Sequence, residues 1–324
     1  MLNRIITFIY NRSPKFRLLS MYYYDMKRFY KHSGAFQQSH LEQKRAQLTM
    51  AYHILEKGLT MPKARFPFGQ EAALNLINLC NSFSEKESAN DDIYTHCIEV
   101  LKSYAQAHKS AGVQLNKKLD TELNILLNKH KEIEADHQIS ISREAFFNDI
   151  DSPFPIFSSS RHTCRHYCGV IDKSKIDAAV ELANNAPSAC NRQHSRVHCI
   201  EREETKQKIL QIQGGNRGFG HSADKLLIIT ADLHDIRWPE ERNDLNTNAG
   251  IFMMNLLYAL HYHKIACCIL NWSVPPRIDK TLRAIIEIPE SENIVGIIAC
   301  GQCPEMVRIA SSPRKNTMEI LKYH

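Results

Sequence analysis

Residues 246–263, NTNAGIFMMNLLYALHYH, read as one long helix with apolar side chains on almost every side. Such a helix is stable only where all of its faces are covered, because water otherwise meets its hydrophobic side chains. The domain that contains it, residues 151–324, is small. We therefore expect a second subunit to cover one face of this helix, which predicts a homodimer.

Helix and strand signals alternate on both sides of this stretch. Short apolar strands are expected at 196–201, 225–231, 265–271 and 294–301. Helices with apolar residues at helical spacing are expected between them, at 171–187, 204–213 and 275–288. Alternation of this kind predicts a mixed sheet flanked by helices.

The first half of the chain carries helical patterns alone. Three amphipathic helices are expected at 46–59, 71–83 and 92–108, and a polar one follows at 118–134. Gly58 suits the end of the first helix, and the segment 61–69, with two prolines and a closing glycine, reads as a loop.

The pattern changes at residues 151–160, DSPFPIFSSS, which read as a connector because prolines and serines dominate them. The predicted fold class is therefore α+β. An all-helical region at residues 1–150 precedes a domain of sheet and helices at 151–324.

Three clusters of polar residues are candidates for binding a ligand. The first, SRHTCRHY (160–167), places two arginines four residues apart, and arginines offer forked donors that match phosphate oxygens. The second, NNAPSACNRQ (184–193), projects small polar side chains from a turn after Pro187. The third, SPRKN (312–316), is basic. Taken alone, each is an ordinary surface feature: a solvated arginine pair, a capping turn and a basic tail.

Taken together and in this order, the clusters resemble the FMN-binding nitroreductase family. The resemblance consists of an Arg-x-Thr-x-Arg opening at 161–165, the run Ala-Pro-Ser-x-x-Asn-x-Gln at 186–193, and Pro-Arg near the C-terminus. The segments 214–233 and 246–272 also resemble the family's central strand, its long dimer helix and the strand after it. The resemblance covers about half of the chain and implies a homodimeric flavoprotein of the nitroreductase fold.

The resemblance also implies which residues hold the cofactor. Arg161, His162, Thr163 and Arg165 would bind the FMN phosphate and ribityl chain, and the C-terminal pair Arg314 and Lys315 would join them. Ser188 and Asn191 would reach the flavin of the partner subunit. Asn216 would contact the isoalloxazine ring, and Asn271 and Trp272 would lie near its reactive nitrogen. No side chain is expected to act as acid, base or nucleophile, because the flavin itself carries the redox chemistry.

Two departures from the family's pattern leave the reaction open. Gln193 is followed by His194 and Ser195, where family members often have Pro-Trp, and Asn271-Trp272 stands where many have Glu-Gly. Electron transfer from NAD(P)H through FMN to a small or lipid-linked substrate is the favoured function. The alternatives are a flavin-holding accessory protein that has lost turnover, and a flavin-dependent dehydrogenase or dehalogenase.

Other motifs are set aside. The run GGNRGFG (214–220) resembles a dinucleotide loop but follows a helix and precedes a strand, the reverse of a Rossmann motif.

Cys300 and Cys303 form a lone CxxC, and His162, Cys164, His166 and Cys168 lack the paired spacing of a structural zinc site. His261 and His263, two apart on a helix, point in different directions. No metal site is therefore predicted.

The helical half offers one further resemblance. HILEKGL with the loop MPKARFPFG is similar to the helical extension of some nitroreductase-like proteins associated with synthesis of bacterial cell-surface polysaccharides. The plain interpretation of His53, Glu56, Lys57 and Arg65 is a salt-linked packing motif between domains.

Composition limits where the protein acts. The chain is 43% hydrophobic and 23% charged, as in globular proteins, and no apolar run reaches the length of a membrane span. Ten cysteines without a recognisable signal peptide indicate reduced thiols and a cytoplasmic location. A net charge of +6 invites anionic ligands, and no nucleic-acid motif accompanies it, so nucleic acid is not an expected partner.

The first 31 residues interleave seven basic residues with aromatic and aliphatic ones, against the single acid Asp25. Such a segment either packs on the helical region or lies on an anionic membrane surface. The second interpretation places the protein peripherally at the inner membrane face.

Overall fold

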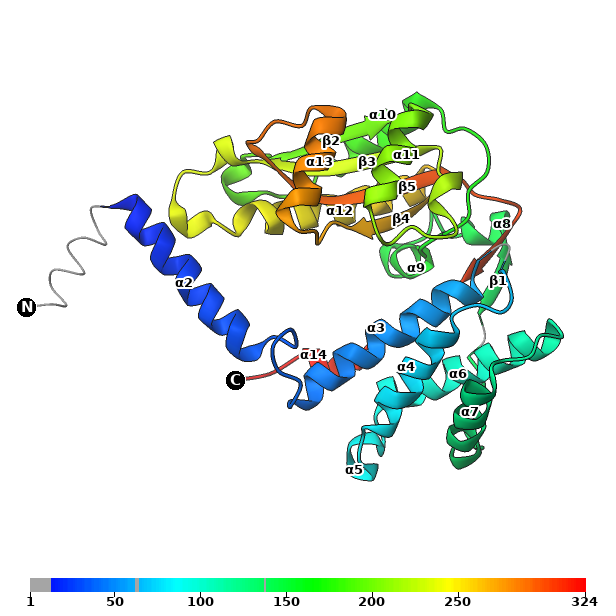
Figure 1. Cartoon of the computed structure of the whole chain (residues 1–324). Coiled ribbons are helices and arrows are strands. Elements are labelled where there is room, and N and C mark those ends of the chain that lie inside the picture. The colour runs from blue at the N-terminus through cyan, green and yellow to red at the C-terminus, as the bar shows by residue number, and fades with distance from the viewer. Residues whose placement is uncertain (1–12, 62–63, 137) are drawn as a thin grey trace, which may run out of the picture. The chain divides into compact units, whose positions relative to one another are not determined.

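The computed structural model describes residues 13–61, 64–136 and 138–324, and the chain divides into two compact units. One unit consists of residues 141–307 together with residues up to Tyr24, and the other of residues 25–140 and 308–324. Each unit has its own core and is described by itself (Figure 1). The α+β class is confirmed, with a helical region ahead of a sheet and its helices.

The unit of residues 25–140 and 308–324 is helical, as the sequence predicts. Its helices are α3 (Leu41–Leu59), α4 (Gln70–Asn81), α5 (Glu85–Ser88), α6 (Asp92–Ser110), α7 (Lys117–Lys129) and the short α14 (Thr317–Ile320). Helix α2 (Pro14–His32) precedes them. Buried aliphatic residues from α3, α4, α6 and α7 form the core, among them Leu55, Ile77, Leu101 and Leu123.

Side-chain caps fix where these helices begin. Asp91 accepts a hydrogen bond from the Tyr94 amide at 2.9 Å at the start of α6, and Asn116 does the same for Leu119 at the start of α7. Each cap satisfies an amide that has no partner within its helix.

Gly58 does not end a helix, contrary to the prediction. Helix α3 continues to Leu59 and is closed by Thr60, whose amide donates to the Glu56 carbonyl. Gly58 lies instead against Phe68, and a Cβ atom built on it would come within 2.3 Å of that ring. Close packing, rather than backbone conformation, accounts for this glycine.

The other unit is built on a four-stranded sheet. The strands are β2 (Ser195–Ile200), β3 (Lys225–Asp232), β4 (Ile265–Asn271) and β5 (Glu292–Gln302), in the order β2-β3-β5-β4. The helices are α8 (Arg143–Phe146), α9 (Phe154–Ser160), α10 (Lys173–Ala183), α11 (Glu203–Ile212), α12 (Asp244–Tyr262) and α13 (Pro276–Ile286). A separate two-stranded sheet pairs β1 (Ile139–Ser142) with β6 (Met306–Ile309). Every strand and helix expected after residue 170 is present.

Helices cover the four-stranded sheet (Figure 1). Helices α10 and α12 share a core with β3, β4 and β5, to which α12 contributes Phe252, Leu256 and Leu260. Helices α11 and α13 pack on each other. Seven of the eight residues of β3 are buried, so both faces of this central strand are covered.

Two features differ from the prediction. All three neighbouring strand pairs of the four-stranded sheet are antiparallel, whereas a mixed sheet was expected. Alternating helix and strand signals predict where the elements lie. They do not predict whether neighbouring strands run parallel or antiparallel. Residues 154–160 form helix α9 rather than a connector, because Pro155 lies in the first turn, where its missing N–H costs nothing.

Candidate functional site

The segment that follows helix α9 carries the first predicted cluster. Arg161 caps that helix, and the Cys164 amide then donates to the Cys267 carbonyl at 3.0 Å, which places the segment beside the edge strand β4. Cys164 and Tyr167 are buried, whereas Arg161, His162, Thr163 and Arg165 are half-buried. Buried residues thus anchor a segment whose polar side chains remain partly accessible.

Arg161 makes this region electropositive. Its Nε atom is buried and has no hydrogen-bond partner among the described residues. Burial, together with the nearby charges of Arg161 and His162, lowers the pKa of His261 to about 4. Burial raises the pKa of Cys267 to about 12, and Arg161 opposes that rise. A buried donor without a partner costs free energy, so an anion that Arg161 could bind would be favoured here.

The second cluster forms a loop with an uncommon backbone. Cys190, Asn191 and Gln193 have φ values of 54°, 54° and 53°, a region that residues other than glycine rarely adopt. The Ser188 hydroxyl accepts a hydrogen bond from the Gln193 amide at 2.9 Å. Strained conformations of this kind persist where the surrounding structure enforces them, and they gather at binding sites.

Helix α12 holds this loop in place. The Asn248 side-chain oxygen accepts a hydrogen bond from the Ala189 amide at 3.0 Å, and its nitrogen donates to the Asp244 carbonyl at 2.7 Å. Asn248 was not among the predicted site residues. The signal was a buried amide on a helix that is otherwise apolar, where a polar side chain needs a specific partner.

Gln213 joins two further predicted residues. Its side-chain nitrogen donates to the Asn271 carbonyl at 2.9 Å, while its oxygen lies 3.1 Å from the Asn216 side-chain nitrogen. Asn216 and the end of strand β4 are thereby neighbours. No spacing pattern marked Gln213, since its partner lies 58 residues further along the chain.

Trp272 is used for packing. The residue is 7% exposed, and its indole nitrogen donates to an Asp279 carboxylate oxygen at 3.1 Å on helix α13. Asn271 beside it is exposed, and its side-chain oxygen accepts from the Ser273 hydroxyl at 3.1 Å. Of the predicted pair, the accessible side chain is that of Asn271.

Arg314 and Lys315 belong to the helical unit. Arg314 is exposed and donates to the Ser312 carbonyl at 2.7 Å, and the Lys315 ammonium lies 3.4 Å from Glu42 of helix α3. The contacts of these two residues therefore lie within their own unit, and a role in binding phosphate remains a prediction.

His194, which follows the second cluster, is fully buried. Neither of its ring nitrogens has a hydrogen-bond partner among the described residues, and Nδ1 lies 3.7 Å from an Asp235 carboxylate oxygen that also lacks one. Ser195 begins strand β2 directly after it. The departure from the family's pattern thus places a buried polar side chain directly beside the loop of the second cluster.

The CxxC cysteines point to different partners. The Cys300 thiol donates to the Lys225 carbonyl at 3.6 Å inside the sheet, whereas Cys303 interacts with Cys164. Burial raises the pKa of Cys300 well above its usual value. The two thiols do not converge on one point.

Two described cavities lie in the same unit, and neither includes a predicted site residue. The larger, of about 520 Å³, is lined by charged residues that include Arg143, Lys175 and Lys264. The smaller, of about 340 Å³, is lined by apolar and aromatic residues from α9 and α12, among them Phe154, Phe157 and Tyr258. Neither of these two cavities is formed by the three polar clusters.

Comparisons with known proteins concern this same unit. Residues 159–215 and 207–302 match the sequence model of the nitroreductase family. No curated protein matches the chain. Among solved structures, the chain is similar to a nitroreductase family protein from Streptococcus pneumoniae, with 20% identity and a TM-score of 0.46 over 53% of this chain and 100% of that one. It is also similar to an FMN-dependent nitroreductase from Clostridium difficile, with 20% identity and a TM-score of 0.41 over 46% and 87% of the two chains.

Proposed function

Because its C-terminal half carries a domain of the nitroreductase family, we propose that this protein is an FMN-dependent oxidoreductase that takes electrons from NAD(P)H. The observation that carries the proposal is the partly accessible, electropositive segment at Arg161, beside a strand edge and with a buried donor that lacks a protein partner. A phosphate monoester has the charge and the oxygen acceptors that such a segment would bind.

The residues present fit FMN. Arg161, His162, Thr163 and Arg165 would hold the phosphate and ribityl chain, and Asn216 and Asn271 would contact the ring. Bound FMN would supply the redox chemistry. The protein's own contribution would then be to bind, orient and shield the cofactor.

The partner subunit completes this site in our proposal. On helix α12, Thr247, Ile251, Met254, Tyr258 and Tyr262 recur at three- and four-residue spacing and remain exposed or half-buried in the single chain. An apolar stripe of this kind is typical of a subunit interface. Ser188 is half-buried and Asn191 exposed in the single chain, and both would then reach the partner's flavin.

Arg161→Ala tests the assignment of the phosphate. The substitution removes a charge-assisted contact worth about 1.5–3 kcal/mol, so FMN affinity should fall by about 10- to 150-fold. Titration of flavin-free protein with FMN, followed by flavin fluorescence, measures it. Arg202→Ala is the matched control, because Arg202 is an exposed arginine of the same unit, at the N-terminal cap of helix α11. Equal losses in both variants, or none in either, would place the phosphate elsewhere.

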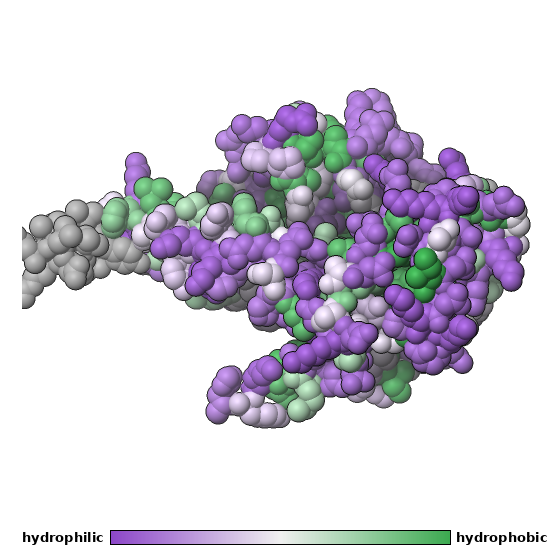
Figure 2. Space-filling model, turned by 60° about the horizontal axis from the view of Figure 1, so that its bottom comes forward, coloured by the Kyte–Doolittle hydropathy of each residue, from purple (hydrophilic) through white to green (hydrophobic). Residues whose placement is uncertain are grey.

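We also propose that the protein acts in the cytoplasm and contacts the inner membrane face through residues 1–31. Residues 1–12 lie outside the described part of the chain. On helix α2, Phe16, Leu19, Tyr23, Met26 and Tyr30 recur at three- and four-residue spacing, and each is at least 37% exposed. Figure 2 shows green and purple side chains next to one another on the helix that follows the grey segment.

Exposed apolar residues beside basic ones suit an amphipathic helix lying in a lipid headgroup region. Among residues 13–61, 64–136 and 138–324, none of the helices has the length and hydropathy that crossing a bilayer requires. Co-sedimentation with anionic vesicles should retain the full chain, weaken with salt and fail after deletion of residues 1–31. Equal recovery of both forms in the supernatant would refute the membrane contact.

A further inference from the structure

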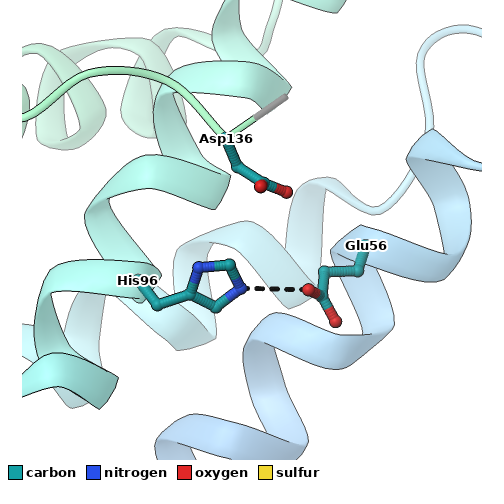
Figure 3. Close-up of side chains that lie close together, drawn as sticks. All are labelled: Glu56, His96 and Asp136. Carbon is teal, nitrogen blue, oxygen red and sulfur yellow. Dashed lines mark hydrogen bonds and ion pairs between the residues drawn. The ribbon is translucent and has the colours of Figure 1, made fainter. Parts of the chain in front are cut away.

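Three side chains of the helical unit direct their polar atoms toward one point. Glu56 lies on α3, His96 on α6 and Asp136 in the segment that follows α7 (Figure 3). One ligand atom from each lies within 4.8 Å of those of the other two. Glu56 is 0% and His96 is 4% exposed, whereas Asp136 is half-buried. The cluster is therefore held inside the unit and opens toward the surface at Asp136.

The hydrogen bonds of His96 do not balance for a neutral ring. Its Nδ1 lies 2.7 Å from a Glu99 carboxylate oxygen and its Nε2 lies 3.0 Å from a Glu56 oxygen. An ionised carboxylate only accepts hydrogen bonds, and a neutral imidazole has only one N–H to donate. Either the ring carries a second proton, or a cation other than the proton lies between Nε2 and Glu56.

The charge of the cluster favours the second arrangement. The three carboxylates of Glu56, Glu99 and Asp136 outnumber the two imidazoles of His96 and His53, and the Glu56 carboxylate is fully buried. A buried carboxylate is stable only when cations or several donors compensate it. A divalent ion supplies twice the charge that an imidazolium does.

The sequence repeats this arrangement on two helices that pack together. His53-Ile-Leu-Glu56 on α3 and His96-Cys-Ile-Glu99 on α6 both have the pattern His-x-x-Glu, which puts the two side chains on one helix face. His53 Nδ1 lies 3.1 Å from the second oxygen of Glu56. The two motifs thus offer two imidazoles and two carboxylates to the space between the helices.

We infer that Glu56, His96 and Asp136 bind a divalent transition metal ion such as zinc. Zinc bonds to imidazole nitrogen and carboxylate oxygen are about 2.0–2.2 Å long, so the ligand atoms of a tetrahedral site lie about 3.4 Å apart. The 3.0 Å between His96 Nε2 and Glu56 is near that value, and a ligand atom of Asp136 lies within 4.8 Å of both. His53 or a water would take the fourth position.

Glu99 is placed to orient the His96 ring. A histidine that binds a metal through one ring nitrogen usually donates the other N–H to a carboxylate or carbonyl, which fixes the ring and strengthens the bond. Glu99 accepts this hydrogen bond from His96 Nδ1 and leaves Nε2 to face Glu56. No metal site was predicted from the sequence, and a metal site would replace the packing role expected for His53 and Glu56.

Zinc titration of the full-length protein tests the inference. After removal of metal by a chelator, the protein should bind one equivalent of zinc and melt at a higher temperature, because an ion bound only to the folded state stabilises it. Cobalt in place of zinc should give the intense visible bands of a four-coordinate site with nitrogen and oxygen ligands.

Matched variants separate this site from other histidines. Asp136→Asn and His96→Asn should abolish stoichiometric binding, and Glu99→Gln should weaken zinc affinity by about 10- to 100-fold. Glu132→Gln, an exposed acid of the same unit near His130, should bind as the wild type does. Asp136 is half-buried, so its variant should fold even if His96→Asn does not, and circular dichroism checks this.

Two results would overturn the inference. One is substoichiometric zinc in folded protein at saturating concentrations, and the other is unchanged binding by Asp136→Asn. Without a metal, the cluster depends on an imidazolium, since hydrogen bonds from His96 to Glu56 and Glu99 raise its pKa although burial lowers it. The helical unit would then lose stability as pH rises through that raised pKa, and zinc would not change this dependence.

Discussion

The charge of Arg161, in the predicted phosphate-binding segment, affects the pKa of the buried His261. The ring is 1% exposed, lies 3.1 Å from the Ser160 hydroxyl through Nε2, and packs on Phe146, Phe147 and Phe157. Burial and the charge of Arg161 keep it neutral. An anion bound at Arg161 would offset that charge, so its binding should be linked to protonation of His261.

The pH dependence of stability follows from this environment. The pKa of His261 is lowered to about 4, against about 6.5 when unfolded, so the unfolded chain binds the proton more readily between these values. Stability should therefore fall as pH decreases from about 6.5 to 4, by at most about 3 kcal/mol from this residue.

Urea unfolding of wild type and His261→Gln across this pH range measures how much His261 contributes to the pH dependence of stability. The variant should lose less stability than the wild type as the solution is acidified. Parallel curves for the two proteins would mean that His261 titrates at its ordinary pKa and that Arg161 does not act on it.

At the scale of elements, helix α12 joins three parts of the proposed site. Its buried face packs on the sheet, Asn248 fixes the loop 188–193, and its C-terminal end brings His261 next to Arg161. Its remaining face carries the apolar stripe that includes Ile251 and Met254, which are 42% and 37% exposed.

A charge in this stripe should separate the subunits. Ile251→Glu would bury a carboxylate in an apolar interface, so we expect a monomer that also loses FMN, because Ser188 and Asn191 would no longer reach the partner's flavin. Sedimentation velocity with and without FMN, followed by protein and by flavin absorbance, measures the oligomeric state and the retention of FMN. Asn246→Glu, exposed on the same helix but away from the stripe, should remain dimeric. A stable monomer that retains FMN would contradict the shared site.

Periodicity predicted the elements well because their patterns are local. Strand β4 coincides with the predicted range 265–271, and α12 begins two residues before the predicted helix. Strand directions could not be predicted in this way, since they depend on pairings such as Leu227 with Ile298, far apart in sequence. Helix α9 escaped notice because proline and serine suit both a helix start and a loop.

Only those residues of the candidate site that belong to recognisable sequence motifs could be predicted. Arg161 and Ser188 belong to recognisable runs, whereas Gln213 and Asn248 act through partners 58 and 59 residues away. The cluster at Glu56 escaped for the same reason, because its nearest ligand partner, His96, lies 40 residues along the chain.

At the scale of the whole molecule, the chain contains two units with separate cores. The domain bounds of 1–150 and 151–324 remain a proposal, whereas the compact units are residues 25–140 with 308–324 and residues 141–307 with those up to Tyr24. Units with separate cores can unfold in separate transitions, and a ligand raises the transition only of the unit that binds it.

Calorimetry should therefore show two transitions with different ligand responses. FMN at about 100 times its Kd should stabilise the flavin-binding unit by about 2.7 kcal/mol, and zinc should raise the other transition. Asp136→Asn should remove the effect of zinc and leave that of FMN. A single transition that both ligands raise together would show that the units unfold as one.

Reduction of the bound flavin tests the proposed function most directly. Full-length protein saturated with FMN is mixed with NADH or NADPH without oxygen, and the visible flavin absorbance is followed. An oxidoreductase should lose this absorbance with at least one of the two donors and recover it when an electron acceptor is added. If the flavin remains oxidised with both donors while it stays bound, the protein holds FMN without turnover. If FMN does not bind at all, the assignment of the site is wrong.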